Sequence, residues 1–156
     1  MGIDQIKGHI AHIESGSDAL EKGEGVNPEV IVALENAFGG WLPNSYKEFL
    51  AVFGWLGRGD AFISGITEKS NLRFGRGDAL FDTEILRAEG GLPDGLVVIQ
   101  KHDDGAYCLD LNTRFDNECA VVNFEHGWNK GIVVARTFTE WMVTFYLHPD
   151  DLGSPP

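Results

Sequence analysis

The chain has 156 residues and a formal net charge of −12, from 24 acidic and 12 basic side chains. This length suits one domain, which we place at residues 1–156, with a core large enough to fold without disulfides or a structural metal. A field of this sign repels nucleic-acid phosphates and anionic membranes, so we expect no direct nucleic-acid partner and no membrane partner. A basic protein partner is compatible with it.

No apolar stretch approaches the roughly 18–20 residues that cross a bilayer. The first residues also lack the basic segment and apolar run of a secretory signal. Cys108 and Cys119 are too few for a disulfide framework and are not spaced as a metal-binding pair. We therefore expect a cytoplasmic protein with two reduced thiols, and a disulfide between neighbouring strands is the alternative.

The first third of the chain carries the signals of three helices. In the first, isoleucines recur at helical spacing, at Ile3, Ile6, Ile10 and Ile13. The polar stretch 18–25 predicts a loop. The second helix begins at Asn27-Pro28, since Asn caps helices and Pro suits the first helical position, and it ends at Gly39-Gly40.

A third helix follows Leu42-Pro43. Two start signals compete there, namely Pro43 itself and a Ser45–Glu48 pair at capping-box spacing. Gly54 ends the helix. Its apolar positions predict a buried face made of Tyr46, Phe49, Leu50 and Phe53.

Glycine and arginine gather in the middle of the chain. The near copies 57–62 and 75–80 each contain Arg-Gly-Asp, and neither continues as a phosphate-binding loop. We predict two tight turns whose charged side chains face water, and a loop that closes over a partner is the alternative. Residues 61–66 predict a short strand. Asp82 predicts the cap of a helix that ends at Gly90-Gly91, with a buried side made of Phe81, Ile85 and Ala88.

The second half of the chain has the pattern of a sheet. Short β-branched or alternating runs predict strands at 96–99, 106–111, 120–124 and 132–134, and turn residues predict a connection over 112–117. Connections this short cannot hold a crossover helix, so we expect antiparallel pairing. Along the second strand, Tyr107, Leu109 and Leu111 share one face, and Ala106, Cys108 and Asp110 share the other.

A helix closes the chain. Thr137 and Glu140 form a capping box, and the apolar face that follows comprises Phe138, Trp141, Met142 and Phe145. His148-Pro149 ends the helix, and we expect the tail 149–156 to fray. The order of elements predicts an α+β fold: a mostly antiparallel sheet of about four to six strands, with N-terminal helices and a C-terminal helix packed against it.

Few residues suggest catalysis. No nucleophile motif is present, and no pair of carboxylates is singled out by its spacing. His102-Asp103-Asp104 and Glu125-His126 lie at predicted strand ends, where they could hold a divalent cation if those ends meet. Loop solvation and a partner-contact surface are the alternatives at these positions. We expect a protein that is not an enzyme and that carries no cofactor and no metal.

Four segments are specific as an ordered set: Leu42–Leu50 with Gly54, Gly91–Ile99, Gly105–Asp110 and Val134–Trp141. In this order they resemble the signature blocks of the SUKH superfamily, also called the Smi/Knr group, over about residues 27–147. The Tyr-Cys-Leu-Asp run within the third block is similar to a bacterial subgroup. The run 53–57 departs from the family pattern, in which many relatives have a shorter Asn-Gly-Gly turn, and this leaves the shape of that loop open.

The resemblance implies an α+β fold and a non-enzymatic role. Bacterial members of the superfamily commonly act as immunity proteins that neutralise a toxin, often a nuclease, and fungal relatives regulate cell-wall assembly. The residues of the family motif are chiefly structural. Tyr46, Phe49, Leu50, Leu109 and Trp141 are therefore implied to be core residues.

An immunity protein or antitoxin is the function we expect. Nucleases are basic where they hold nucleic acid, so an acidic inhibitor can cover that surface, and opposite fields speed association. The expected contacts lie in loops of the acidic sheet half and are Asp103, Asp104, Asp116, Glu118 and Glu125, with Trp128 as an anchor. Two alternatives stay open: a regulatory or scaffold module without a toxin partner, and a small hydrolase or metal-dependent enzyme with a deep pocket around His102 and His126.

Overall fold

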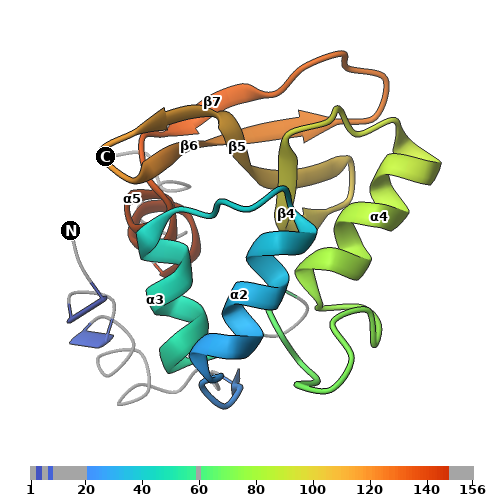
Figure 1. Ribbon diagram of the computed structural model, residues 1–156. Coiled ribbons are helices and arrows are strands. Elements are labelled where there is room, and N and C mark those ends of the chain that lie inside the picture. Colours follow the sequence, from blue (N-terminus) through green and yellow to red (C-terminus); the bar gives the residue numbers. More distant parts are fainter. Residues whose placement is uncertain (1–2, 5–6, 9–20, 59–60, 148–156) are drawn as a thin grey trace.

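The computed structural model describes residues 3–4, 7–8, 21–58 and 61–147 (Figure 1). The helices are α2 (Pro28–Ala37), α3 (Asn44–Val52), α4 (Ala79–Gly90) and α5 (Phe138–Trp141), which continues as the π-helix η1 (Met142–Leu147). The strands are β1 (Glu21–Lys22), β2 (Leu56–Arg58), β3 (Ala61–Ile63), β4 (Leu96–His102), β5 (Gly105–Phe115), β6 (Glu118–Glu125) and β7 (Ile132–Ala135). The predicted α+β class is confirmed.

Some predictions fall outside the described residues. They are most of the first isoleucine-patterned helix, the tip of the first Arg-Gly-Asp turn at 59–60, the end of the last helix at His148-Pro149, and the tail. Among the described residues, no helix combines the length and the apolar character needed to cross a membrane.

The larger sheet has the order β4-β5-β6-β7, and each neighbouring pair is antiparallel, as predicted. The predicted connection over 112–117 is too long, because β5 continues past an irregularity in its pairing with β6 as far as Phe115. Only Asp116 and Asn117 form the turn, with φ angles of 48° and 62°. Two successive left-handed residues suit a tight hairpin whose twist matches that of its strands.

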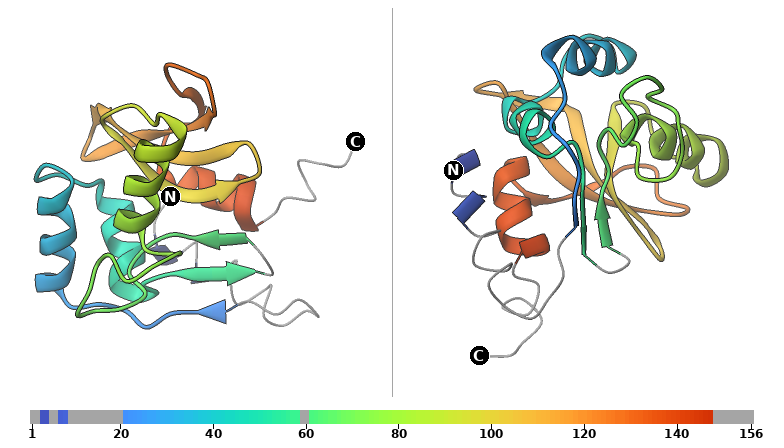
Figure 2. Two further views of the ribbon diagram at one scale, coloured as in Figure 1. Left: turned by 90° about the vertical axis from the view of Figure 1, so that its right-hand side faces the viewer. Right: turned by 90° about the horizontal axis from the view of Figure 1, so that it is seen from below.

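A second, smaller sheet has the order β1-β2-β3 and lies beside the β4 edge of the larger one (Figure 2). The Ser64 N–H, just after β3, donates a hydrogen bond of 2.7 Å to the Ile99 carbonyl of β4. The predicted strand at 61–66 is therefore confirmed in its first half. The strands β1 and β2 were not predicted, because two or three residues are too few to establish an alternating pattern.

The larger sheet is covered on both faces. One face packs against α3 and α5 and contributes Val97, Ile99, Leu109 and Val121 to the main core. The other face packs against the C-terminal half of α4 and contributes Val98, Ala106, Cys108, Val122 and Phe124 to a second cluster. The alternation predicted for the second strand is thus confirmed, since its residues divide between the two clusters.

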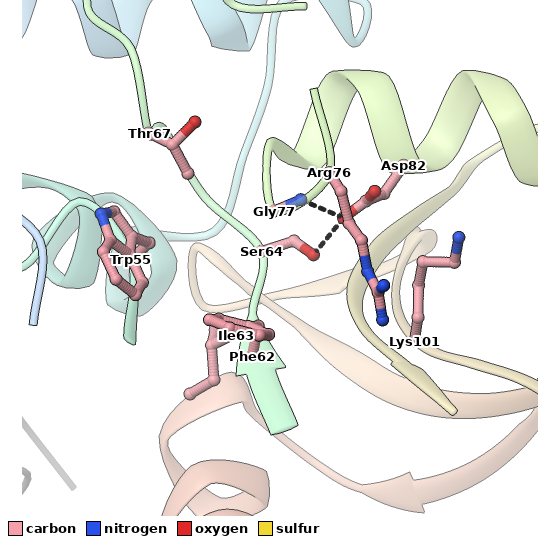
Figure 3. Close-up of a pocket in the computed structure, with 9 residues that line it drawn as sticks. All are labelled: Trp55, Phe62, Ile63, Ser64, Thr67, Arg76, Gly77, Asp82 and Lys101. Carbon is pink, nitrogen blue, oxygen red and sulfur yellow. Dashed lines mark hydrogen bonds between the residues drawn. The ribbon is translucent and has the colours of Figure 1, made fainter. Parts of the chain in front are cut away.

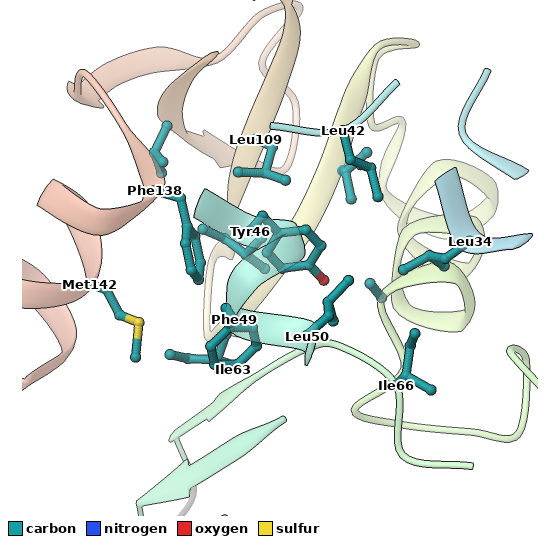
Figure 4. Packing of buried hydrophobic residues seen from close by; sticks show 14 of the residues in the cluster. Leu34, Leu42, Tyr46, Phe49, Leu50, Ile63, Ile66, Leu109, Phe138 and Met142 are labelled. Carbon is teal, nitrogen blue, oxygen red and sulfur yellow. The ribbon is translucent and has the colours of Figure 1, made fainter. Parts of the chain in front are cut away.

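The main core is rich in aromatic rings (Figure 4). The predicted face of α3 is confirmed, because Tyr46, Phe49 and Leu50 are fully buried and Phe53 is nearly so. The Tyr46 hydroxyl donates a hydrogen bond of 2.8 Å to the Ser64 carbonyl, which ties α3 to the segment after β3. Burial raises the pKa of Tyr46, so this phenol stays protonated as a donor.

The closing helix also begins as predicted. The Thr137 hydroxyl accepts a hydrogen bond from the Glu140 N–H, at 3.1 Å. In a standard capping box the Glu140 carboxylate would accept a hydrogen bond from the Thr137 N–H. Here it accepts one from the Arg136 N–H, one residue earlier in the chain. Phe138, Trp141 and Met142 are fully buried.

Helix α4 differs from its prediction. It begins at Ala79, and Asp82 lies inside its first turn instead of capping it. Its buried positions are Ala79, Leu80, Asp82, Thr83 and Leu86, whereas Phe81 and Ile85 are half-buried and Ala88 is exposed. The predicted face was therefore wrong, because Thr83 is taken into the interior by a hydrogen bond from the Val98 N–H of β4 to its hydroxyl, at 2.9 Å. The stop at Gly91, with a φ of 72°, is confirmed.

The two cysteines do not pair. Cys108 belongs to the second cluster and Cys119 to the main core, on opposite faces of the sheet, and both are free. The disulfide alternative is therefore wrong. Burial raises the pKa of the Cys119 thiol to about 12 and also raises that of Cys108, so neither is a reactive thiolate near neutral pH.

Candidate functional site

The five acidic residues expected to contact a partner lie at two opposite ends of the β5–β6 ribbon. Asp103 and Asp104 form the β4–β5 turn, and Glu125 pairs with Gly105 beside them. Asp116 and Glu118 lie at the other end, where Phe115 pairs with Glu118. Because β5 spans 11 residues, the two groups are on the order of 30 Å apart. We call Asp103, Asp104 and Glu125 the hairpin-end acidic group.

The predicted meeting of strand ends occurs at the hairpin-end acidic group. The His126 N–H donates to the Asp104 carbonyl at 2.9 Å, and the Trp128 N–H donates to the Glu125 carbonyl at 3.0 Å. The side chain of Trp128 is half-buried against the second cluster. Among the residues that the structure describes, no three His, Cys, Asp or Glu side chains are grouped so that they could hold a metal ion.

Glu118 has a structural partner within the chain. Its carboxylate accepts hydrogen bonds from the Ser45 N–H at 3.0 Å and from the Ser45 hydroxyl at 2.6 Å. Nearby, the Asn44 N–H donates to the Asn117 carbonyl at 2.9 Å. A carboxylate 73 residues away therefore caps α3, which the predicted Ser45–Glu48 capping box does not do.

Removing this cap has a predicted cost. We expect Glu118→Ala to lower the free energy of unfolding by about 1–2 kcal/mol, since it leaves the first turn of α3 without its acceptor. Glu48→Ala is the matched control, because Glu48 is exposed on the same helix. Urea denaturation of the two variants measures both changes, and an equal effect from both would contradict the assignment of the cap to Glu118.

A pocket of about 380 Å³ lies where the smaller sheet, the first turn of α4 and β4 meet (Figure 3). Neither His102 nor His126 lines it, so it is not the pocket envisaged by the hydrolase alternative. Aromatic and apolar side chains line one part of it and charged side chains another. The lining residues are Trp55, Phe62, Ile63, Ser64, Thr67, Arg76, Gly77, Asp82 and Lys101.

Asp82 is the buried acid of this pocket, with 2% of its surface exposed. One carboxylate oxygen, Oδ2, accepts hydrogen bonds from the Ser64 hydroxyl at 2.7 Å and from the Gly77 N–H at 3.2 Å. The other oxygen, Oδ1, has no hydrogen-bond partner among the residues that the structure describes. Burial raises the pKa of Asp82, against the opposing effect of the Ser64 hydrogen bond, because a charge is costly away from water.

Asp82 gives the stability of the protein a predicted pH dependence. Because its pKa is higher in the folded chain than in the unfolded chain, the folded state keeps this proton to higher pH. Its contribution is therefore fully present below the ordinary Asp pKa of about 4 and is lost as the pH rises through the raised value. We expect Asp82→Asn, which has no such proton, to gain stability relative to the wild type between about pH 4 and about pH 7. Urea denaturation across that range checks this, and a constant difference would contradict it.

The second Arg-Gly-Asp turn helps to build the pocket. Asp78 was predicted to face water, but it is fully buried. Its Oδ1 accepts hydrogen bonds from the N–H and hydroxyl of Thr67, at 2.7 and 2.8 Å, and its Oδ2 accepts one from the Gly75 N–H at 2.9 Å. This turn therefore holds Arg76 and Gly77 at the pocket as a fixed loop.

Two unusual features of the sequence contribute residues to this pocket, although neither was enough to predict it. One is the run 53–57, where the chain departs from the family pattern and supplies Trp55. The other is the repeated Arg-Gly-Asp, whose second copy supplies Arg76. Asp82 was instead interpreted as a helix cap, and nothing in the sequence distinguished Lys101 from other charged residues.

A comparison with known families agrees with the fold. The model of the family SUKH_5, described as SMI1-KNR4 cell-wall, matches residues 3–147 of the 156. The match includes every described helix and strand together with both candidate sites. The chain therefore belongs to the SUKH superfamily.

Proposed function

We propose that this protein is a non-enzymatic immunity protein or antitoxin that binds and neutralises a basic toxin, such as a nuclease, in the cytoplasm. The observation that supports this most is the family match over residues 3–147, because the superfamily includes immunity proteins. The net charge of −12 supports the choice of a basic partner, since opposite fields accelerate association and favour the correct pair.

The hairpin-end acidic group, with Trp128, is the contact surface that we propose. Asp103 and Asp104 are both exposed, and they lie on one tight turn beside Glu125. Trp128 follows in the next loop, and part of its side chain stays exposed for an aromatic contact. Asp116, at the far end of the ribbon, belongs to a larger partner footprint. Glu118 already holds α3 and contributes there mainly through its charge.

The test uses the product of the neighbouring gene as the toxin. We expect its expression to kill cells unless this protein is present, and we expect the two purified proteins to bind each other. Asp103→Lys combined with Asp104→Lys is expected to weaken binding at least tenfold, mainly at low salt, because the field that attracts the partner is reversed locally.

The matched control carries the same change of charge elsewhere. Glu29→Lys combined with Glu48→Lys alters two exposed carboxylates on α2 and α3, and it is expected to change affinity less than threefold. Equal losses in the two double variants would refute the contact surface while leaving the immunity role in place. Viability without this protein, with binding to a housekeeping protein instead, would favour the regulatory or scaffold alternative.

A further inference from the structure

The pocket beside α4 has an aromatic wall. The rings of Trp55 and Phe62 are 6.0 Å apart, and both side chains are half-buried. Gly57 makes room for both rings, because a Cβ at that position would lie 2.7 Å from the Phe62 ring and 3.1 Å from the Trp55 ring. The wall is thus set by the backbone of β2, and it offers flat apolar surface on which a further ring can pack.

Two cations lie at the opposite side of the pocket. Arg76 comes from the turn before α4 and Lys101 from β4, and both are exposed (Figure 3). Within the described part of the chain, neither side chain makes a hydrogen bond or a salt bridge, although Lys101 interacts electrostatically with Asp82. Arg73, on the same loop as Arg76, is by contrast bonded to Glu84. In a chain of net charge −12, two cations in one pocket that are not engaged in salt bridges attract an anionic group.

The same side of the pocket also contains an acceptor, Asp82 of α4, which is hydrogen-bonded to Ser64 and Gly77 (Figure 3). Its Oδ1 is buried and has no hydrogen-bond partner in the described ranges of the chain, whereas buried polar atoms in proteins are usually hydrogen-bonded. An occupant that donates a hydrogen bond to this carboxylate, with a small shift of the side chain, removes that deficit. The pocket therefore combines an aromatic wall, an anion-attracting pair and one buried acceptor.

We propose that this pocket binds a free aromatic α-amino acid. The three parts of such a ligand match the three parts of the pocket: the ring packs on Trp55 and Phe62, the carboxylate meets Arg76 and Lys101, and the ammonium faces Asp82. The volume of about 380 Å³ lies within the range of about 300–1,000 Å³ that is usual for small-molecule sites. This binding does not depend on the proposed toxin partner, so either proposal can fail alone.

The test is calorimetric titration of the whole protein with L-phenylalanine and L-tryptophan. Three analogues each lack one part: 3-phenylpropionate lacks the ammonium, phenethylamine lacks the carboxylate, and L-alanine lacks the ring. We expect at least one of the two amino acids to bind and each analogue to bind about tenfold or more weakly. No binding of either amino acid, or equal binding of any analogue, overturns the proposal.

Variants locate the binding. Arg76→Gln and Lys101→Gln change exposed side chains and are expected to keep the fold while weakening the amino acid about tenfold. Lys130→Gln, an exposed cation outside the pocket, is the matched control and is expected to leave affinity unchanged. The indole N–H signal of Trp55 in the NMR spectrum, assigned with Trp55→Phe, should shift on binding. Equal affinities in all three charge variants, or an unmoved Trp55 signal, place the ligand elsewhere and overturn the assignment.

Discussion

Phe138→Ala is expected to lower the free energy of unfolding by about 3–5 kcal/mol, the largest effect we predict for a single substitution in this protein. Phe138 is the first residue of α5 and is fully buried. Its ring meets Tyr46 edge-on at 5.2 Å and Phe49 at 5.4 Å, both from α3, and it stacks against Trp141 at 6.0 Å. Truncation therefore leaves a cavity between α3 and α5 whose rigid aromatic walls cannot collapse easily.

Urea or thermal denaturation measures this loss. Phe74→Ala is the matched control, since Phe74 is 66% exposed and its truncation is expected to change stability by less than about 0.5 kcal/mol. Phe138→Leu should recover part of the loss, because leucine refills much of the volume. A small effect of Phe138→Ala would mean that α5 is not anchored to α3 through this ring.

The aromatic core was predictable because the patterns that produce it are long and local. Tyr46, Phe49 and Leu50 stand at helical spacing after Pro43, and β5 alternates over enough residues to assign both of its faces. The errors lie where a distant partner decides the outcome. Ser45 is capped by Glu118, across 73 residues of sequence, and no local spacing contains that information.

The candidate sites were less predictable than the fold. Asp103, Asp104 and Glu125 were brought together correctly, because antiparallel pairing makes the ends of neighbouring strands meet. Asp116 and Glu118, expected in the same contact surface, lie at the other end of the ribbon, as the antiparallel pairing of the strands predicted at 106–111 and 120–124 requires. The pocket was missed because its wall combines Trp55, from the loop before β2, with Phe62 of β3. The pairing of these two strands was not predicted, since three residues are too few to give β2 a detectable period.

The backbone next to that pocket is closely packed at one glycine, and Gly65→Ala is expected to lower the free energy of unfolding by about 3 kcal/mol. A Cβ at Gly65 would lie 1.9 Å from the Gly54 carbonyl oxygen. That oxygen cannot move away freely, because it also accepts the Ile66 N–H at 2.8 Å. Gly65 itself is held on both sides, since its N–H donates to the Gly77 carbonyl and its carbonyl accepts the Ala79 N–H, each at 2.9 Å.

Gly75→Ala is the matched control for this prediction. A Cβ at Gly75 would meet nothing within 4 Å. The substitution is therefore expected to leave stability unchanged, or to raise it by up to about 1 kcal/mol because alanine lowers the conformational entropy of the unfolded chain. Gly65→Ala should in addition steepen the pH dependence that Asp82 produces, because Ser64 and Gly77, whose hydrogen bonds lower the pKa of Asp82, both adjoin the displaced backbone. Urea denaturation at about pH 4 and about pH 7 reports both effects. A Gly65→Ala protein as stable as Gly75→Ala, with the pH dependence unaltered, would show that the segment relaxes without disturbing the pocket.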